Sequence, residues 1–454
     1  MRRTRRNTIR AAAAVSVLAL VAAGCSGDAD RDENTVSVAY MNYGTFIAMD
    51  SLMQGVKEDF EAENPDITVE LNAIEAPADD YQTQVNLMHG SPGEAPDLIY
   101  QDTFTINQDA DAGYLMPLDD YFADWDESDQ FSDQEADAVT SLDGDRYGVM
   151  LGTDVRGLWY NTELLEEAGI DTPWEPATWD EVLDAARTVQ SELGDGVVPL
   201  HVFSGTPAAE AASLEGFQML LSGTGDELFD DGSEQWVTSS AGFSDSLEFI
   251  DTIFEEGLTF DPQDALDANM GTINNEERFP AGELAISLDG SWATQSWIEE
   301  ANQPWPEWED HMEFTRMPTQ GGEEPGATSM SGGWALSMGA HATDPDLAWE
   351  VMTLALNKEN ATKFAIEGGQ IPVRDDVAED PDFVDEAPMA EEFAELVEIT
   401  GFRPAYSEYP RVSLAIQEAM EAVMLDEATP EEAAELYAEE VEGVVGPENV
   451  TTGS

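Results

Sequence analysis

Carboxylates and aromatic rings are the side chains through which this chain could do chemistry. Its 454 residues include 96 Asp and Glu against 17 Lys and Arg, together with 11 Trp, 11 Tyr and 18 Phe. Two carboxylates about 5–10 Å apart suffice for a glycosidase, so the acid count leaves that enzyme class open. The same groups also bind sugars, because rings cover the apolar face of a pyranose and carboxylates accept hydrogen bonds from its hydroxyls.

Other catalytic constellations do not show in the sequence. The four histidines, His89, His201, His311 and His341, form no i, i+4 pair and no metal-ligand spacing with cysteine. The sequence has no phosphate-binding loop, no nucleophile elbow and no zinc motif. A serine triad stays open, because its members are scattered along a sequence. We therefore expect no catalytic residue, no metal and no cofactor, with a glycosidase as the alternative.

The first residues have the pattern of an export signal. Five arginines in the first ten residues precede the apolar run 11–23. That run is too short to span a bilayer, which takes about 20 residues. The pattern predicts a secretory signal peptide over 1–24. Twin-arginine export is an alternative to the general route, although Asn7 and Thr8 stand where that signal has apolar residues.

Cys25 is the only cysteine, so the chain has no internal disulfide and the thiol needs another explanation. The segment 22–25, Ala-Ala-Gly-Cys, resembles a bacterial lipobox, in which the cysteine is lipidated and becomes the first residue. Ala22 replaces the usual Leu, and ordinary cleavage beside an incidental thiol is the alternative. We expect lipidation at Cys25, followed by a polar, acidic tether over 25–35.

The net charge is unusual. It is −79 at pH 7, and cleavage of the signal peptide removes five Arg and no acid. Such a surface repels itself in dilute buffer, whereas at molar salt the Debye length falls to about 3 Å and the repulsion is screened. The acids are spread over the whole chain, which predicts a halophilic acidic surface. The charge also argues against binding to nucleic acid or to anionic lipid.

The order of elements after residue 35 predicts an α/β fold. Strand-like alternation at 36–40 and 67–71 frames a helical stripe at 52–60, and a second stripe at 81–88 precedes a buried strand at 97–100. This is the βαβ order of a largely parallel sheet covered by helices. Roughly 430 residues exceed a single core, so two domains are expected.

Two helix starts carry capping-box signals. Thr178 with Glu181 precedes an apolar stripe, and Thr429 with Glu432 has Pro430 at the first helical position. Both predict helices in the second half of the fold.

Several segments stand in an order and at spacings that are typical of one family. They are Ala95-Pro96-Asp97-Leu98, Arg146-Tyr147-Gly148-Val149 with Leu158-Trp159-Tyr160-Asn161, Thr178-Trp179-Asp180-Glu181, Gly282-Glu283-Leu284-Ala285-Ile286 with Asp289-Gly290-Ser291-Trp292, Gly332-Gly333-Trp334-Ala335-Leu336, and Arg403-Pro404 with Tyr409-Pro410. Together they resemble the extracellular solute-binding proteins of family 1, the maltose and trehalose binding-protein type, over nearly all of 35–445.

The resemblance implies a two-lobe, periplasmic-binding-protein-like fold of type 2 with a ligand cleft between the lobes. Lobe one would contain 36–150 and 335–395, and lobe two would contain 151–334 and 396–454. The chain would then be the solute-binding component of an ABC importer that captures a carbohydrate. Three aromatic platforms favour a disaccharide or short oligosaccharide. A secreted glycoside hydrolase with a carboxylate pair and a non-transport lectin are the alternatives.

By resemblance, seven residues would bind the ligand: Asp102, Asp154, Trp292, Trp334, Arg403, Tyr409 and Tyr43. Asp102 and Asp154 would accept from sugar hydroxyls, although Asp102 could instead cap a helix. Trp292 and Trp334 would stack on sugar rings, although either could be a core tryptophan.

The far lobe would add hydroxyl-binding groups from Arg403 and Tyr409. A salt bridge is the alternative for Arg403, and packing is the alternative for Tyr43. Arg156, Arg403 and Arg411 could help to bind an anionic ligand, which the overall negative field opposes. The expected partners are a carbohydrate, ABC permease subunits and, through the lipid, the extracellular face of the cytoplasmic membrane. The protein is expected to be a monomer.

Overall fold

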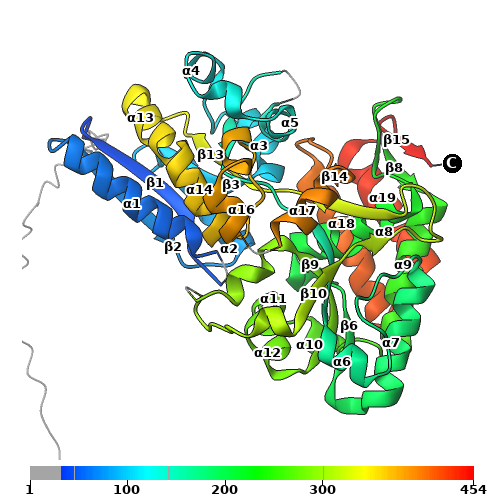
Figure 1. The fold of residues 1–454 in the computed structure, drawn as a ribbon. Coiled ribbons are helices and arrows are strands. Elements are labelled where there is room, and N and C mark those ends of the chain that lie inside the picture. Colours follow the sequence, from blue (N-terminus) through cyan, green and yellow to red (C-terminus); the bar gives the residue numbers. More distant parts are fainter. Residues whose placement is uncertain (1–31, 45, 142–143, 300, 388, 454) are drawn as a thin grey trace, which may run out of the picture.

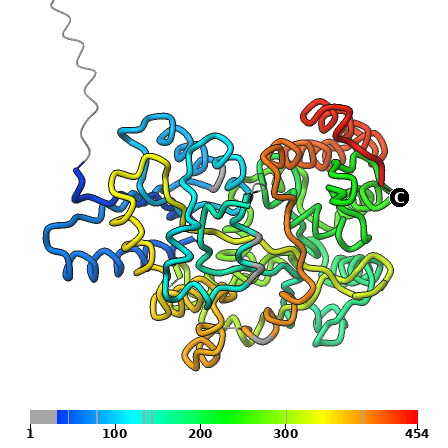
Figure 2. Tube along the Cα trace, turned by 90° about the horizontal axis from the view of Figure 1, so that it is seen from above, coloured from blue at the N-terminus to red at the C-terminus, as the bar shows by residue number. Residues whose placement is uncertain are grey.

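The computed structural model describes residues 32–453, except 45, 142–143, 300 and 388, and has two α/β lobes (Figure 1). The predicted signal peptide, Cys25 and most of the tether lie outside the described residues. Viewed from above, the first segments and the 334–367 region lie together on one side, while the 156–290 and C-terminal segments lie on the other (Figure 2). Each lobe is therefore assembled from segments far apart in the sequence.

Lobe one is built on a five-stranded sheet in the order β2-β1-β3-β13-β4. Its strands are β1 (Thr35–Met41), β2 (Thr68–Ile74), β3 (Leu98–Asp102), β4 (Gly148–Met150) and β13 (Trp334–Met338). The first three are parallel, as the βαβ pattern predicts, and β13 runs antiparallel between β3 and β4. The carboxyl ends of β1 and β3 meet at one edge, where parallel α/β sheets bind ligands.

Helices cover both faces of this sheet. They are α1 (Ala48–Glu63), α2 (Ala78–His89), α3 (Thr103–Asp111), α4 (Asp119–Ala123), α5 (Asp133–Val139), α13 (Pro345–Leu356), α14 (Lys358–Glu367), α15 (Asp375–Ala378) and α16 (Pro381–Glu386). The apolar stripe predicted on α1 is buried through Leu52, Val56 and Phe60 in the core of the lobe.

Lobe two is built on a four-stranded mixed sheet in the order β10-β5-β9-β6. Its strands are β5 (Arg156–Asn161), β6 (Val198–His201), β9 (Leu284–Gly290) and β10 (Met312–Thr315). Strand β9 is buried along its whole length and ends at Gly290, two residues before Trp292. The sheet therefore delivers the predicted stacking residue to its edge.

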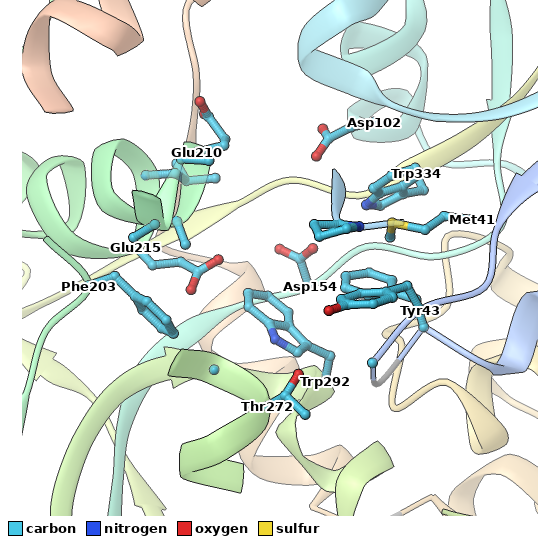
Figure 3. Close-up of a pocket in the computed structure, with 18 of the residues that line it drawn as sticks. Met41, Tyr43, Asp102, Asp154, Phe203, Glu210, Glu215, Thr272, Trp292 and Trp334 are labelled. Atoms are coloured by element: carbon cyan, nitrogen blue, oxygen red, sulfur yellow. The ribbon is translucent and has the colours of Figure 1, made fainter. Parts of the chain in front are cut away.

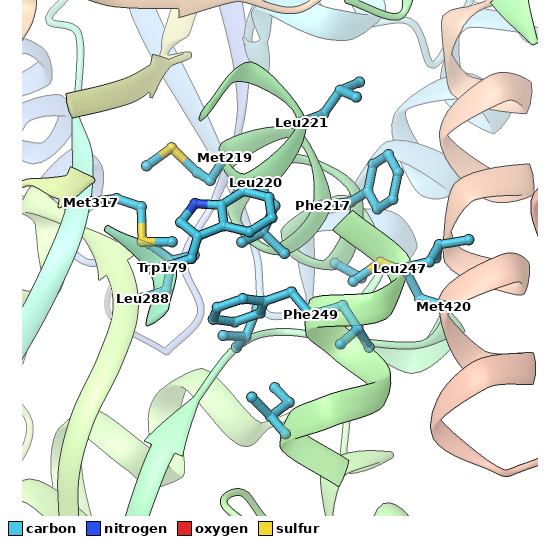
Figure 4. Close-up of a cluster of buried hydrophobic side chains, with 14 of the residues drawn as sticks. Trp179, Phe217, Met219, Leu220, Leu221, Leu247, Phe249, Leu288, Met317 and Met420 are labelled. Atoms are coloured by element: carbon cyan, nitrogen blue, oxygen red, sulfur yellow. The ribbon is translucent and has the colours of Figure 1, made fainter. Parts of the chain in front are cut away.

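The helices of lobe two pack around a large apolar core (Figure 4). They include α6 (Thr162–Glu167), α7 (Trp179–Leu193), a π-helix (Ala211–Gln218), α8 (Met219–Thr224), α9 (Ala241–Glu255), α18 (Tyr409–Met424) and α19 (Pro430–Val445). Thr178 caps α7, and Thr429 forms a full capping box with Glu432 on α19, which confirms both predicted helix starts. The core residues come from elements far apart in sequence, for example Phe217, Leu247 and Met420.

Shorter elements complete lobe two and the joint between the lobes. They are α10 (Pro262–Ala265), α11 (Met270–Ile273), α12 (Phe279–Ala281), α17 (Ala390–Val397), β7 (Phe229–Asp230), β8 (Gln235–Ser239), β11 (Met317–Pro318), β12 (Ala327–Ser331), β14 (Thr400–Phe402) and β15 (Val450–Thr452). Within the described ranges, none of the helices is both long and apolar enough to span a bilayer.

The chain passes between the lobes three times. The first passage, 151–155, joins β4 to β5, and Thr153 exchanges backbone hydrogen bonds with Ile371. The second, 332–333, joins β12 to β13. The third lies between α16, which packs on α14, and α17, whose Phe393 packs against Trp159. We place the last lobe boundary there, ahead of the expected residue 395.

Candidate ligand-binding site

A cavity of about 470 Å³ lies between the lobes, within the range typical of small-molecule sites (Figure 3). Lobe one lines it with Met41, Tyr43, Tyr100 and Trp334, and lobe two with Phe203, Glu210, Glu215, Asn275, Asp289 and Trp292. The first passage contributes Asp154, and the segment after β14 contributes Arg403. Six of the seven predicted site residues therefore line one cavity: Tyr43, Asp102, Asp154, Trp292, Trp334 and Arg403.

The aromatic walls face one another from opposite lobes. Trp334 stacks with Tyr100 at 5.2 Å between ring centroids and also contacts Phe46, so it is at once a core residue and a cavity wall. Trp292 is half-buried and lies over the Arg156 guanidinium at 4.6 Å. Figure 3 shows Trp292 and Tyr43 projecting into the same space.

Gly290 explains how Trp292 reaches the cavity. A Cβ placed on Gly290 would stand 2.0 Å from the indole ring, so the ring lies flat against bare backbone. Any larger residue at 290 would displace the ring. Within the predicted Asp-Gly-Ser-Trp loop, the glycine therefore positions the aromatic side chain.

One ion-pair cluster joins the lobes and is called here the Arg403 cluster. The Arg403 guanidinium donates to Asp102 of lobe one at 2.7 Å and to Glu210 of lobe two at 3.2 Å. Asp102 also caps α3 by accepting from the Phe104 amide. Asp102 therefore caps a helix and also lines the cavity, while its binding of sugar hydroxyls stays a prediction. The salt bridge considered for Arg403 is present.

A second cluster, the Arg156 cluster, lies deeper. The Arg156 guanidinium donates to Asp154 and lies 3.8 Å from a carboxylate oxygen of Glu215. Asp154 also accepts from the Gly332 amide at 2.9 Å, which ties the first passage between the lobes to the second. Burial and three neighbouring acids raise the pKa of Glu215, and the Arg156 charge offsets this only in part.

A further acid, Asp289, is the second-last residue of the buried strand β9, beside this cluster. It accepts from its neighbour's amide, that of Gly290, at 2.7 Å and from the Asn275 side chain at 3.2 Å. Burial raises the pKa of Asp289, and these hydrogen bonds and Arg156 lower it in part. The Asn275 Oδ1 atom is buried and has no hydrogen-bond partner among the described residues.

A family model describing bacterial extracellular solute-binding proteins matches residues 56–410. The chain belongs to this family. Members act outside the cytoplasm, which places this binding protein outside the cytoplasmic membrane.

Individual relatives agree with this assignment. A putative binding protein of Brucella abortus is 23% identical over 428 residues, covering 92% of this chain and 93% of the relative. A lactose-binding protein of Rhizobium radiobacter is 22% identical over 54% of each chain. The solute-binding protein of an ABC transporter from Thermotoga lettingae, solved with α-D-tagatose, is 25% identical with a TM-score of 0.77, covering 91% of this chain and 100% of that one. The maltose-bound MalE3 of T. maritima has the same fold, with a TM-score of 0.77 at 22% identity over 90% of this chain and 100% of that one.

Tyr409 requires a correction. It was expected to bind sugar hydroxyls, but its side chain is fully buried behind the cavity lining. Its hydroxyl donates to Glu210 at 2.6 Å and accepts from Gln218 at 2.8 Å. Tyr409 is the first residue of α18, followed by Pro410, and its ring packs in the core of lobe two. In this binding protein Tyr409 therefore supports Glu210 and does not face the ligand space.

Five residues that line the cavity were not predicted from the sequence as site residues: Phe203, Glu210, Glu215, Asn275 and Asp289. Asp289 had a signal, because it opens the Asp-Gly-Ser-Trp loop before Trp292. Glu215 had none: it lies on a π-helix whose wider turn sets which side chains face the cavity, and no sequence pattern marks that turn.

The lobes also meet on the opposite rim of the cavity. The Tyr43 hydroxyl donates to Asn269 at 2.6 Å, and the Asn302 amide donates to the Gly44 carbonyl at 3.2 Å. With the Arg403 cluster, these contacts close the cavity from two sides. The two lobes thus contact each other on both sides of the cavity. No group of His, Cys, Asp and Glu in the described part of the chain is arranged to hold a metal ion.

Proposed function

We propose that this protein binds a carbohydrate, a disaccharide or short oligosaccharide, and delivers it to the permease of an ABC importer. The observation that carries the proposal is the meeting of Tyr43, Trp292 and Trp334 with buried carboxylates in one interlobe cavity. Aromatic faces cover the apolar side of a pyranose, and carboxylates form strong, short hydrogen bonds with its hydroxyls. The names of the lactose-binding and multiple sugar-binding relatives support the same class.

Tyr43, Asp102, Asp154, Trp292, Trp334 and Arg403 are proposed to contact the ligand. The first and last of these also take part in contacts between the lobes, so a ligand lying against them would stabilise the closed form. A hinge closure of this kind presents one surface to a permease only when ligand is bound.

The remaining parts of the proposal concern the setting. We propose a monomer held at the extracellular face of the cytoplasmic membrane by lipid on Cys25. The acidic surface is proposed to suit a saline exterior, in which the mutual repulsion of the acids is screened. The proposed activity is binding without turnover.

A thermal-shift screen of mono- and disaccharides on the mature protein in molar salt tests the proposal. At 100 times Kd, a ligand stabilises the folded form by about 2.7 kcal/mol. The sugar that raises the melting temperature should be recovered unchanged after overnight incubation. If amino acids, peptides or polyamines raise the melting temperature and no sugar does, the carbohydrate assignment is wrong; hydrolysis of a glycoside would favour an enzyme instead.

Gly290→Ala provides a matched test of the site. The added methyl displaces the Trp292 ring, so the Kd of the bound sugar should rise about ten-fold, or 1.4 kcal/mol. Gly443→Ala is the control, because a Cβ there meets nothing within 4 Å. Equal sugar affinity in both variants, measured by calorimetry, would show that Trp292 does not contact the sugar.

A further inference from the structure

The cavity is lined by more acidic groups than its own arginines can pair with. Among the described residues that line it, seven are acidic and two, Arg156 and Arg403, are basic. Asp80 and Asp267 lie at the exposed rim, but five acids lie inside: Asp102, Asp154, Glu210, Glu215 and Asp289. Each guanidinium is already shared between two carboxylates. Ionising the unpaired acids inside the cavity is costly without a counter-charge, and a cationic ligand would supply one.

The acidic groups that lack a full set of hydrogen-bond partners lie at one end of the cavity. In the Arg403 cluster, Glu210 accepts from Arg403, Tyr409 and Ser413, which satisfies its carboxylate. Glu215 is different: it is 9% exposed, and its side chain makes no hydrogen bond within the described part of the chain, only the loose pairing with Arg156 at 3.8 Å. A carboxylate this buried and this weakly bonded has most of its acceptor capacity free.

Two neighbours share that property. Asp289 has no basic residue within ion-pair distance in the described chain, and it is held by an amide on each side. Asn275 gives its amide hydrogens to Asp289, which leaves Oδ1 as a buried acceptor without a partner. Figure 3 shows Glu215 near the rings of Phe203 and Trp292, and Asp289 and Asn275 line the same cavity. When Glu215 is ionised, all three residues offer acceptors to a ligand.

Negatively charged hydrogen-bond acceptors beside aromatic ring faces form the surroundings that a cationic nitrogen prefers. An ammonium group donates several hydrogen bonds, compensates the surplus charge and is attracted to ring faces. A neutral hydroxyl supplies a donor but no charge. Building on the proposed carbohydrate function, we propose that the cavity selects an amine-bearing sugar, whose ammonium group lies between Glu215 and Asp289.

Matched pairs of probes test this preference: D-glucose with D-glucosamine, D-galactose with D-galactosamine, and cellobiose with fully deacetylated chitobiose. Any neutral sugar that the thermal screen identifies is added with its own amino analogue. Affinities are measured by calorimetry at a pH below the pKa of the amine. The amino member of the pair that binds should do so at least ten-fold more tightly than the neutral member. N-acetylation of that amine, which removes its charge, should abolish the preference.

Glu215→Gln supplies the second arm. It should reduce affinity for the amino sugar about ten-fold and reduce the preference for the amine, whereas Glu435→Gln on the exposed face of α19 should change neither. A neutral sugar that binds as tightly as its amino analogue would overturn the inference and leave the carbohydrate function intact. Binding of non-sugar solutes alone would overturn both, so the two failures are distinguishable.

Discussion

The Arg403 and Arg156 clusters have the same composition, one arginine between two carboxylates, but the structure uses them differently. The Arg403 cluster spans the lobes, from Asp102 on one side to Glu210 on the other, and every charge in it has close partners. The Arg156 cluster lies in the first passage and lobe two, and Glu215 in it is only loosely paired. The comparison indicates that the Arg403 cluster holds the lobes together, whereas the Arg156 cluster keeps hydrogen-bond acceptors free for a ligand.

The two clusters are buried to a similar degree, but their carboxylates differ in how many hydrogen-bond donors reach them. The side chains of Arg156 and Arg403 are both 6% exposed, so neither pair is a surface salt bridge of negligible energy. What separates the clusters is the number of donors that reach each carboxylate. A buried charge contributes to binding only where its hydrogen-bonding capacity is not already used by the protein.

The largest effect is expected for Arg156→Met. The change leaves Asp154, Glu215 and Asp289 buried without a cation, and breaking a buried pair in this way costs about 3–5 kcal/mol. Denaturant unfolding in molar salt should show a loss of that size in the free energy of unfolding. Arg316→Met, in an exposed pair with Glu395, is the control and should cost less than about 1 kcal/mol.

A second variant sharpens this result. The loss of stability in Arg156→Met could come from the acids left without a counter-charge. In that case, adding Glu215→Gln should restore part of the stability, because it removes one of these buried acids. Additive losses in the double variant would show instead that Arg156 acts through packing against Trp292.

An intermediate effect is expected for Arg403→Gln. The variant loses the charged hydrogen bonds that join Asp102 to Glu210, worth about 2 kcal/mol, and most of that loss should fall on the closed form. Small-angle X-ray scattering should show a larger radius of gyration for the unliganded variant than for the wild type. Arg411→Gln, on the exposed start of α18, should leave the scattering curve unchanged.

The two clusters also show how far sequence can predict such a site. The α/β order, the start of α19 and the loop carrying Trp292 all follow local rules of periodicity, capping and glycine placement. Asp102 and Arg403, which are separated by 301 positions, meet only because the third passage returns to the lobe interface. Tyr409 lies in the expected segment, but a helix start turns it inward. Local pattern thus predicts which segments form the site, whereas tertiary packing decides which side chains face the ligand.

The smallest effect concerns the pH dependence of stability. Burial raises the pKa of Glu215 in the folded state above its value in the unfolded chain. The unfolded state therefore loses this proton first, and the stability from the protonated form, complete at low pH, is lost as pH rises toward the folded pKa. Between the two pKa values the free energy of unfolding should fall by at most about 1.4 kcal/mol per pH unit from this one group. Glu215→Gln should flatten that decline, while Glu435→Gln should retain it. An identical pH profile in all three proteins, measured by urea unfolding without ligand, would mean that Glu215 is already fully compensated and that the contrast between the clusters does not hold.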